Sequence, residues 1–190
     1  MRVIAGTRKG HLLQAPRGLL TRPTSDRTRT ILFDLLGGRV GGTAVVDLFA
    51  GSGALGIEAL SRGAAQVDFV EKNRRVAEII RRNLHHTHLE DHARVIVADA
   101  FTFLNRASHA GTGAAEGHLT YDLLFADPPY GMGHAERLLD DLSRLRILNA
   151  GAIAVIEESA RVELQSEAGR LRCILRRVIG ETALHFYETS

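Results

Sequence analysis

The chain has 190 residues, of which 45% are hydrophobic, and a formal net charge of only +2. This length and composition allow one globular domain with a real core, and no apolar run is long enough to span a bilayer or resembles a signal peptide. The single cysteine, Cys173, excludes an internal disulfide and a multi-cysteine zinc site. We therefore expect a cytoplasmic protein that is monomeric and has neither a membrane attachment nor a metal site.

The charge is distributed unevenly along the chain. Residues 1–30 contain seven basic residues and one acidic residue, a net charge of +6, while the remainder contains 17 basic and 21 acidic residues, a net charge of −4. A basic segment on a mildly acidic body favours an anionic partner. Nearly all of these basic residues are arginine, which binds phosphate through two parallel hydrogen bonds.

The first part of the chain is expected to form a small extension over residues 1–40. Residues 2–5 and 11–14 flank the turn-like sequence GTRKG and predict a short hairpin. A loop follows, and then a helix that Thr24 or Ser25 can cap and that two glycines end. The basic residues of this extension indicate a role in nucleic-acid binding.

From residue 44 onward, apolar strands alternate with amphipathic helices. The strands are expected at 44–50, 66–72, 94–100, 121–127 and 152–159, with helices between them. Such alternation predicts an α/β domain over residues 41–190, with a mostly parallel sheet and helices on both faces. Residues 171–188 read as two strands around a Gly-Glu turn, an antiparallel hairpin at the edge of the sheet. Residues 108–120 are expected to be a surface loop.

A glycine-rich loop connects the first of these strands to a helix. Gly51, Gly53 and Gly56 form a GxGxxG pattern, which nicotinamide enzymes also use. Asp47 lies just before the glycines, where a buried carboxylate would repel a dinucleotide pyrophosphate by several kcal/mol, to order of magnitude. S-adenosylmethionine has no phosphate and offers an ammonium and a sulfonium. The acidic loop therefore favours S-adenosylmethionine as the cofactor.

Two further carboxylates end the next two strands. Glu71 follows the glycines by about twenty residues, a spacing that suits a carboxylate binding both ribose hydroxyls. Asp99 can accept a hydrogen bond from the adenine amino group, with the backbone of Ala100 nearby. Each acid alone can also be read as a helix N-cap. Three acids at three successive strand ends favour a ligand site, because ligands of open α/β sheets bind at those ends.

The fourth strand ends in Asp127-Pro128-Pro129-Tyr130, a corner that is rich in acceptors and poor in donors. The exocyclic amine of a nucleobase is a poor nucleophile, because its lone pair is delocalised into the ring. The Asp127 carboxylate and the Pro128 carbonyl can accept its two hydrogens and turn the lone pair toward a methyl group. The Tyr130 ring can stack on the flipped-out base. The motif thus predicts in-line methylation of an exocyclic amine.

The chain resembles the RsmD-type family of small-subunit ribosomal RNA guanine-N2 methyltransferases. The resemblance is carried by MRVIAGTRKG, TRPTSDRTRTILFDLL, DLFAGSGALGIEALSRGA, FVEKN, DPPY and GETALHFYE, in that order. It implies a Rossmann-like class I methyltransferase fold with a seven-stranded sheet, S-adenosylmethionine as cofactor, and ribosomal RNA or an assembling small ribosomal subunit as partner. It also implies roles for three groups of residues: the cofactor contacts Asp47, Gly51, Glu71 and Asp99, the target-base residues Asp127 and Tyr130, and the RNA-binding arginines Arg22, Arg27 and Arg29.

Three other functions are compatible with parts of this pattern. Related amino-methyltransferases act on adenine or cytosine of DNA or RNA, or on a protein glutamine, with a similar tetrapeptide, and the basic extension favours nucleic acid. A non-catalytic RNA-binding module could keep the fold, but the intact Asp127 and glycines speak against it. A nicotinamide oxidoreductase is disfavoured by Asp47 and by the proline corner.

Overall fold

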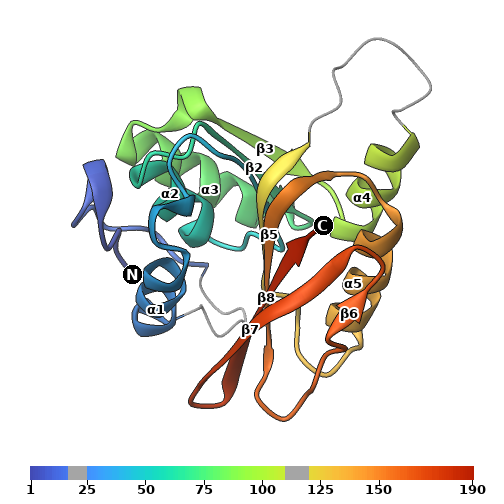
Figure 1. Cartoon of the computed structure of the whole chain (residues 1–190). Coiled ribbons are helices and arrows are strands. Elements are labelled where there is room, and N and C mark those ends of the chain that lie inside the picture. Colours follow the sequence, from blue (N-terminus) through green and yellow to red (C-terminus); the bar gives the residue numbers. More distant parts are fainter. Residues whose placement is uncertain (17–24, 110–119) are drawn as a thin grey trace.

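A single eight-stranded sheet organises the computed structural model of the chain, with helices packed on both of its faces (Figure 1). The structure describes residues 1–16, 25–109 and 120–190. The strands are β1 (Ala44–Leu48), β2 (Gln66–Glu71), β3 (Ala93–Val97), β4 (Tyr121–Ala126), β5 (Leu148–Ser159), β6 (Glu167–Ala168), β7 (Leu171–Ile179) and β8 (Thr182–Thr189). Their order across the sheet is β3-β2-β1-β4-β5-β8-β7-β6.

The first five strands pair in parallel, and the last three add antiparallel partners beyond β5. The predicted parallel sheet with a C-terminal hairpin is therefore confirmed. The count differs by one strand, because β6 has only two residues and so lacks the periodicity by which a strand is found in a sequence. β5 begins earlier than expected, at Leu148 rather than Ala152.

Two apolar clusters, one on each face of the sheet, join the helices to the strands. The helices are α1 (Asp26–Leu36), α2 (Ala54–Ser61), α3 (Arg74–Thr87), α4 (Ala100–His109) and α5 (His134–Arg144), with short 3-10 turns at Gly6–Arg8, Gly37–Arg39 and Glu90–His92. α1, α2 and α3 cover one face, and α4 and α5 cover the other (Figure 1). None of these helices, within the described part of the chain, is long and apolar enough to cross a membrane.

The N-terminal extension begins with a short hairpin, as the sequence predicts. Arg2 and Leu12 form an antiparallel bridge, Val3 and Leu13 donate their backbone N–H groups to the carbonyls of His11 and Met1, each at 3.0 Å, and residues 6–8 between the two segments form a 3-10 turn. The expected cap of α1 is present: Ser25 Oγ accepts a hydrogen bond from the backbone N–H of Thr28 at 3.0 Å. The division of the chain at residue 40 stays a prediction.

Two buried side chains hold the extension on the rest of the fold. The Glu58 carboxylate, in α2, accepts the backbone N–H groups of Ile4 and Ala5 at 2.7 and 2.9 Å. Asn83, in α3, donates to the Gln14 carbonyl and accepts its N–H, and its amide also donates to the Ser52 carbonyl in the glycine loop. Residues 1–14 are therefore tied to α2 through Glu58 and to α3 through Asn83, which also bonds to the glycine loop.

Close packing of α2 on β2 depends on Gly56. A Cβ atom at this position would lie 2.3 Å from a ring carbon of Phe69 and 2.8 Å from a methyl carbon of Val67. We expect Gly56→Ala to lower the free energy of unfolding by about 1–3 kcal/mol, because the helix must move away from the sheet. Denaturant unfolding measures this. Gly41→Ala is the control, since a Cβ there meets no heavy atom of the described residues within 4 Å, and equal losses in both variants would contradict the packing account.

Candidate active site

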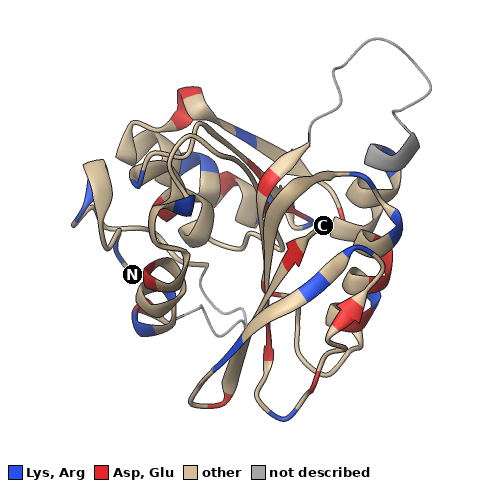
Figure 2. Ribbon diagram, in the orientation of Figure 1, with Lys and Arg blue, Asp and Glu red and all other residues tan. Residues whose placement is uncertain are grey.

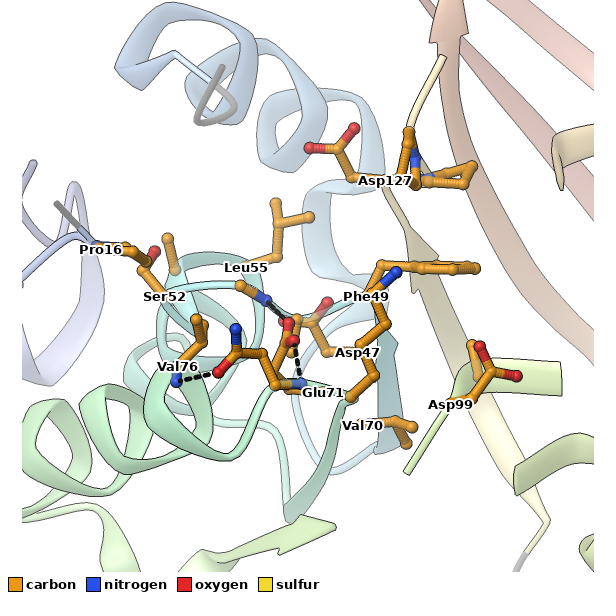
Figure 3. Close-up of a pocket in the computed structure, with 18 of the residues that line it drawn as sticks. Pro16, Asp47, Phe49, Ser52, Leu55, Val70, Glu71, Val76, Asp99 and Asp127 are labelled. Atoms are coloured by element: carbon orange, nitrogen blue, oxygen red, sulfur yellow. Dashed lines mark hydrogen bonds between the residues drawn. The ribbon is translucent and has the colours of Figure 1, made fainter. Parts of the chain in front are cut away.

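A cavity of about 460 Å³ opens at the carboxyl ends of β1 to β4, a size suited to a small-molecule ligand (Figure 3). The strand order β3-β2-β1-β4 places Asp99, Glu71, Asp47 and Asp127 along this edge in that sequence. The structure thus brings all four predicted acids into one pocket, while their roles stay predictions. Other lining residues come from the segments that follow each of these four strands and from the N-terminal extension, among them Ala15, Pro16, Gly51, Ser52, Lys72, Asn73, Ala100, Pro128 and Tyr130.

Asp47 lies beneath the glycine loop and is 2% exposed. One of its carboxyl oxygens accepts the backbone N–H of Gly56 at 3.0 Å, in the first turn of α2. Burial raises the pKa of Asp47 to about 8, which the Glu71 carboxylate also favours and the bond from Gly56 opposes. A cation bound in the pocket would favour the ionised form of this carboxyl group.

Glu71 ties the glycine loop to the start of α3. Its carboxylate accepts the backbone N–H of Gly51 at 3.0 Å and that of Asn73 at 2.8 Å (Figure 3). Asn73 in turn caps α3 by accepting the N–H of Arg75 at 2.9 Å. A carboxylate has about four acceptor sites, so these two bonds leave capacity for ribose hydroxyls.

Asp99 is the N-cap of α4, the reading that the sequence also allows. One of its oxygens accepts the backbone N–H groups of Phe101 and Thr102, each at 3.1 Å. Among the residues that the structure describes, the second oxygen is left for a ligand. Ala100, at 3% exposure, lines the same cavity. The cap and the predicted contact with adenine are therefore compatible.

The corner that follows β4 turns Asp127 and Pro128 into the cavity. Pro128 is buried, whereas Tyr130 is 36% exposed. The Tyr130 hydroxyl donates to Glu157 at 2.7 Å and lies 3.0 Å from the Thr182 hydroxyl. Burial, together with the Glu157 and Asp127 carboxylates, raises the pKa of Tyr130 well above its usual value, so its hydroxyl keeps its proton.

The structure adds pocket residues that the sequence did not indicate. Phe49 lies between β1 and the glycine loop with a left-handed φ of 60°, a conformation that costs a residue other than glycine about 1–3 kcal/mol. Its ring contacts Phe101 at 5.9 Å and His134 at 6.3 Å, between ring centroids. The sequence gives no indication of this backbone conformation, because a phenylalanine before a glycine loop is normally expected to have a negative φ. Gly53, which the glycine pattern also predicts as a cofactor contact, has a left-handed φ of 78°, and a Cβ there would lie 3.0 Å from Ile80; its contact with a cofactor stays a prediction.

The three predicted RNA-binding arginines have different positions. Arg22 lies outside the described residues, and Arg27 is exposed on the first turn of α1. Arg29 corrects the prediction: it is fully buried, and its guanidinium donates to the Arg2 carbonyl and to Asp26 at 3.0 Å. Its place on the core-facing side of α1 gives it a structural role instead. Figure 2 shows basic residues on α1 and along β7.

Comparison with known sequences gives matches over nearly the whole chain. A family model described as conserved hypothetical protein 95 matches residues 1–188. The chain is 36% identical to the protein YlbH of Bacillus subtilis (strain 168), over 99% of this chain and 98% of that protein. It is 32% identical to ribosomal RNA small subunit methyltransferase D of Escherichia coli (strain K12), over 99% of this chain and 89% of that protein.

Comparison with solved structures gives the same overall fold. The Escherichia coli protein yhhF superposes with a TM-score of 0.84 at 33% identity and covers 100% of this chain and 98% of its own. An RNA methyltransferase from Salinibacter ruber, in complex with S-adenosyl-L-homocysteine, has a TM-score of 0.64 at 15% identity and covers 88% of this chain and 93% of its own. The second likeness shows a shared methyltransferase fold.

The raised pKa of Asp47 predicts how the stability of the cofactor-free protein changes with pH. The pKa is about 8 in the folded protein against 3.8 ordinarily, so the folded state binds more protons between these values. This contribution to stability is present below the lower pKa and is lost as the pH rises through the higher one, by at most about 1.4 kcal/mol per pH unit. The Asp47→Asn variant has no titrating group at this position. The difference between its free energy of unfolding and that of the wild type should therefore shift in favour of the variant as the pH rises.

Thermal unfolding across this pH range measures the difference. Asp91→Asn, at an exposed aspartate remote from the loop, is the control and should run parallel to the wild type. Parallel curves for wild type and Asp47→Asn would contradict the raised pKa.

Proposed function

The chain belongs to the RsmD family of S-adenosylmethionine-dependent methyltransferases, and we propose that it methylates the exocyclic N2 amine of a guanine in small-subunit ribosomal RNA. One observation carries this proposal. The Asp127 carboxylate, followed by two prolines, lines the same cavity as Asp47 and Glu71. An acceptor site for an amine therefore lies beside an acidic site that suits a cationic methyl donor.

S-adenosylmethionine supplies a methyl group activated by a sulfonium. Its amino-acid part is proposed to lie against the turn at Gly51, with Asp47 beneath it balancing the positive charge. Glu71 would accept the ribose hydroxyls with the capacity that its two backbone bonds leave. Asp99 and the backbone of Ala100 would accept and donate at the adenine edge. The acceptor set suits the molecule, since carboxylates would accept hydrogen bonds from its hydroxyls and balance its cationic groups, and no phosphate has to be placed.

The corner after β4 is proposed to hold the target base. Asp127 and the Pro128 carbonyl accept the two N–H groups of the amine, so the nitrogen lone pair points to the methyl carbon. Tyr130 stacks on the flipped-out ring. Bound S-adenosylmethionine would supply its methyl group by in-line displacement at the sulfonium and would leave as S-adenosylhomocysteine, and the Asp127 carboxylate would take up the proton that the methylated amine gives up. Rate enhancement comes from position and from the Asp127 charge, which faces the charge that develops on nitrogen.

The RNA partner is proposed on different grounds. The relative from Escherichia coli is named as acting on ribosomal RNA of the small subunit. In this chain, Arg27 is exposed at the start of α1 and belongs to the basic N-terminal part. We infer that residues 1–40 form an RNA-binding extension of the methyltransferase domain 41–190. Naked RNA or an assembling small subunit, both cytoplasmic, would serve as substrate for the monomer.

Cofactor binding is the first test. Calorimetry should show binding of S-adenosylmethionine and none of NAD. Asp47→Ala and Glu71→Ala should each weaken binding about tenfold or more, because each removes a charged partner worth roughly 1.5–3 kcal/mol. Glu78→Ala, an exposed residue on the outer side of α3, is the control and should bind as the wild type does. NAD binding without any response to S-adenosylmethionine would refute the cofactor assignment.

The role of Asp127 is tested by kinetics. Asp127→Ala should lower kcat by about 10²- to 10³-fold with nearly unchanged affinity for S-adenosylmethionine, because the carboxylate acts mainly in the transition state. Asp127→Asn should lose less, since its amide oxygen still accepts a hydrogen bond. Full methyl transfer by Asp127→Ala would rule out this mechanism.

The product identifies the base. Mass mapping of small-subunit ribosomal RNA should find one N2-methylguanine missing from a strain that lacks this protein and restored by the wild type. If the missing methyl group belongs to an adenine or cytosine amine, the assignment to an exocyclic amine stands and the assignment to guanine is wrong. A methyl group missing from a ring nitrogen or a carbon would overturn the assignment to an exocyclic amine.

A further inference from the structure

Tyr130 is fixed at one end and open at the other. Its hydroxyl lies between Glu157 and Thr182, which are 6% and 4% exposed, while the whole residue is 36% exposed. Glu157 is on β5 and Thr182 is the first residue of β8. The side chain thus reaches from the loop after β4 to the two antiparallel strands next to it.

The protons of this contact can be assigned from the groups that make it. A phenol has one O–H, and Tyr130 donates it to a carboxylate oxygen of Glu157 at 2.7 Å. Since Tyr130 gives its proton to Glu157, the Thr182 hydroxyl must donate to the Tyr130 oxygen across the remaining 3.0 Å. Hydrogen bonds to two different strands fix the position of the phenol oxygen. The motion that remains for the ring is rotation about the axis from Cβ to the hydroxyl oxygen.

We propose that Glu157 and Thr182 are positioning residues that hold the Tyr130 ring in place before the target base arrives. This inference rests on the proposed function, in which the ring stacks on that base. The backbone of the loop does not provide the same restraint, because Gly131 and Gly133 both adopt left-handed φ values of 72° and 67° and glycine permits many conformations. If the Tyr130 ring is already ordered in the free protein, RNA binding does not have to pay the conformational entropy of ordering that side chain.

The inference also gives a role to the C-terminal hairpin. Thr182 belongs to GETALHFYE, a segment by which the chain resembles its family and for which the methyl-transfer chemistry has no use. Thr182 pairs with Ser159 on β5 and with Ile179 on β7, so it stands where β8 begins, at the turn of the hairpin. The hairpin therefore extends the sheet beyond the cofactor strands and provides the support against which Tyr130 is fixed.

Kinetics of Thr182 variants test the proposal. Thr182→Val replaces the hydroxyl by a methyl group of similar size and should raise the KM for RNA about three- to tenfold, with kcat and cofactor affinity near the wild type. Thr182→Ser restores the hydroxyl and should restore KM. Thr189→Val is the matched control: Thr189 lies on the same strand, is also 4% exposed, and its hydroxyl bonds to Asn149 and Ala152 instead. Its KM should be that of the wild type.

Tyr130→Phe removes the bond to Thr182 from the other side and removes the bond to Glu157 as well. It should therefore raise KM at least as much as Thr182→Val does, and the double variant should be no worse than Tyr130→Phe alone, because the Thr182 hydroxyl acts only through the Tyr130 oxygen. Additive effects, or a wild-type KM in folded Thr182→Val protein, would overturn the proposal.

A measurement without RNA separates this inference from the proposed function. The chain has three tyrosines, and Tyr121 and Tyr187 are almost completely buried, so NMR of labelled tyrosine rings can be assigned with Tyr130→Phe. The Tyr130 ring should be rigid in the wild type and in Thr189→Val, and clearly more mobile in Thr182→Val. An equally rigid ring in Thr182→Val would refute the positioning role. Absence of methyl transfer by wild-type protein with a rigid ring would instead refute the proposed function.

Discussion

The site depends on one constraint, which is that β1 to β4 run parallel and end at the same edge of the sheet. The backbone has to turn after each of these strands, and the N–H groups of the turn and of the following helix start need acceptors. The acids at the strand ends provide them: Asp47 for Gly56, Glu71 for Gly51, and Asp99 for the start of α4. The residues that shape the loops are thus the ones that face the pocket. A substitution there changes the loop as well as the ligand site, and the two effects have to be measured separately.

Gathering carboxylates in one cavity has an electrostatic cost, and Asp47 carries part of it. Its pKa is raised because it is buried and because Glu71 is close. In a protein without ligand, a proton relieves this cost, and a cationic ligand would relieve it further. The acids at this edge of the sheet therefore favour a cationic ligand over a neutral or anionic one. The Tyr130 corner is built differently: the Tyr130 hydroxyl is paired with buried groups on β5 and β8, which lie outside the set of strands that carry the four acids.

Features that depend on local pattern could be predicted, and features that depend on distant contacts could not. The strands, the glycine loop and the acids follow from periodicity and from their place at strand ends, and the cap at Ser25 follows from residue type. Arg29 reads as a solvent-facing arginine in a basic segment, yet the carbonyl of Arg2 and the core side of α1 bury it. No spacing connects Tyr130 with Thr182, which are 52 residues apart along the chain. The left-handed backbone at Phe49 likewise does not follow from its residue type.

The bonds that tie the N-terminal extension to the fold also bear on how the chain reaches its native state. Glu58 binds Ile4 and Ala5 across 54 and 53 residues, and Asn83 binds Gln14 across 69. Contacts between residues so far apart in the sequence require a long loop to close. The loss of chain entropy on closure opposes folding until the contacts have formed. On a growing polypeptide, α3 is complete long after the first residues have been made, so the extension must wait for its binding partner. The wall of the pocket formed by Ala15 and Pro16 is consequently assembled late, after β1, α2, β2 and α3 have provided a surface on which to dock.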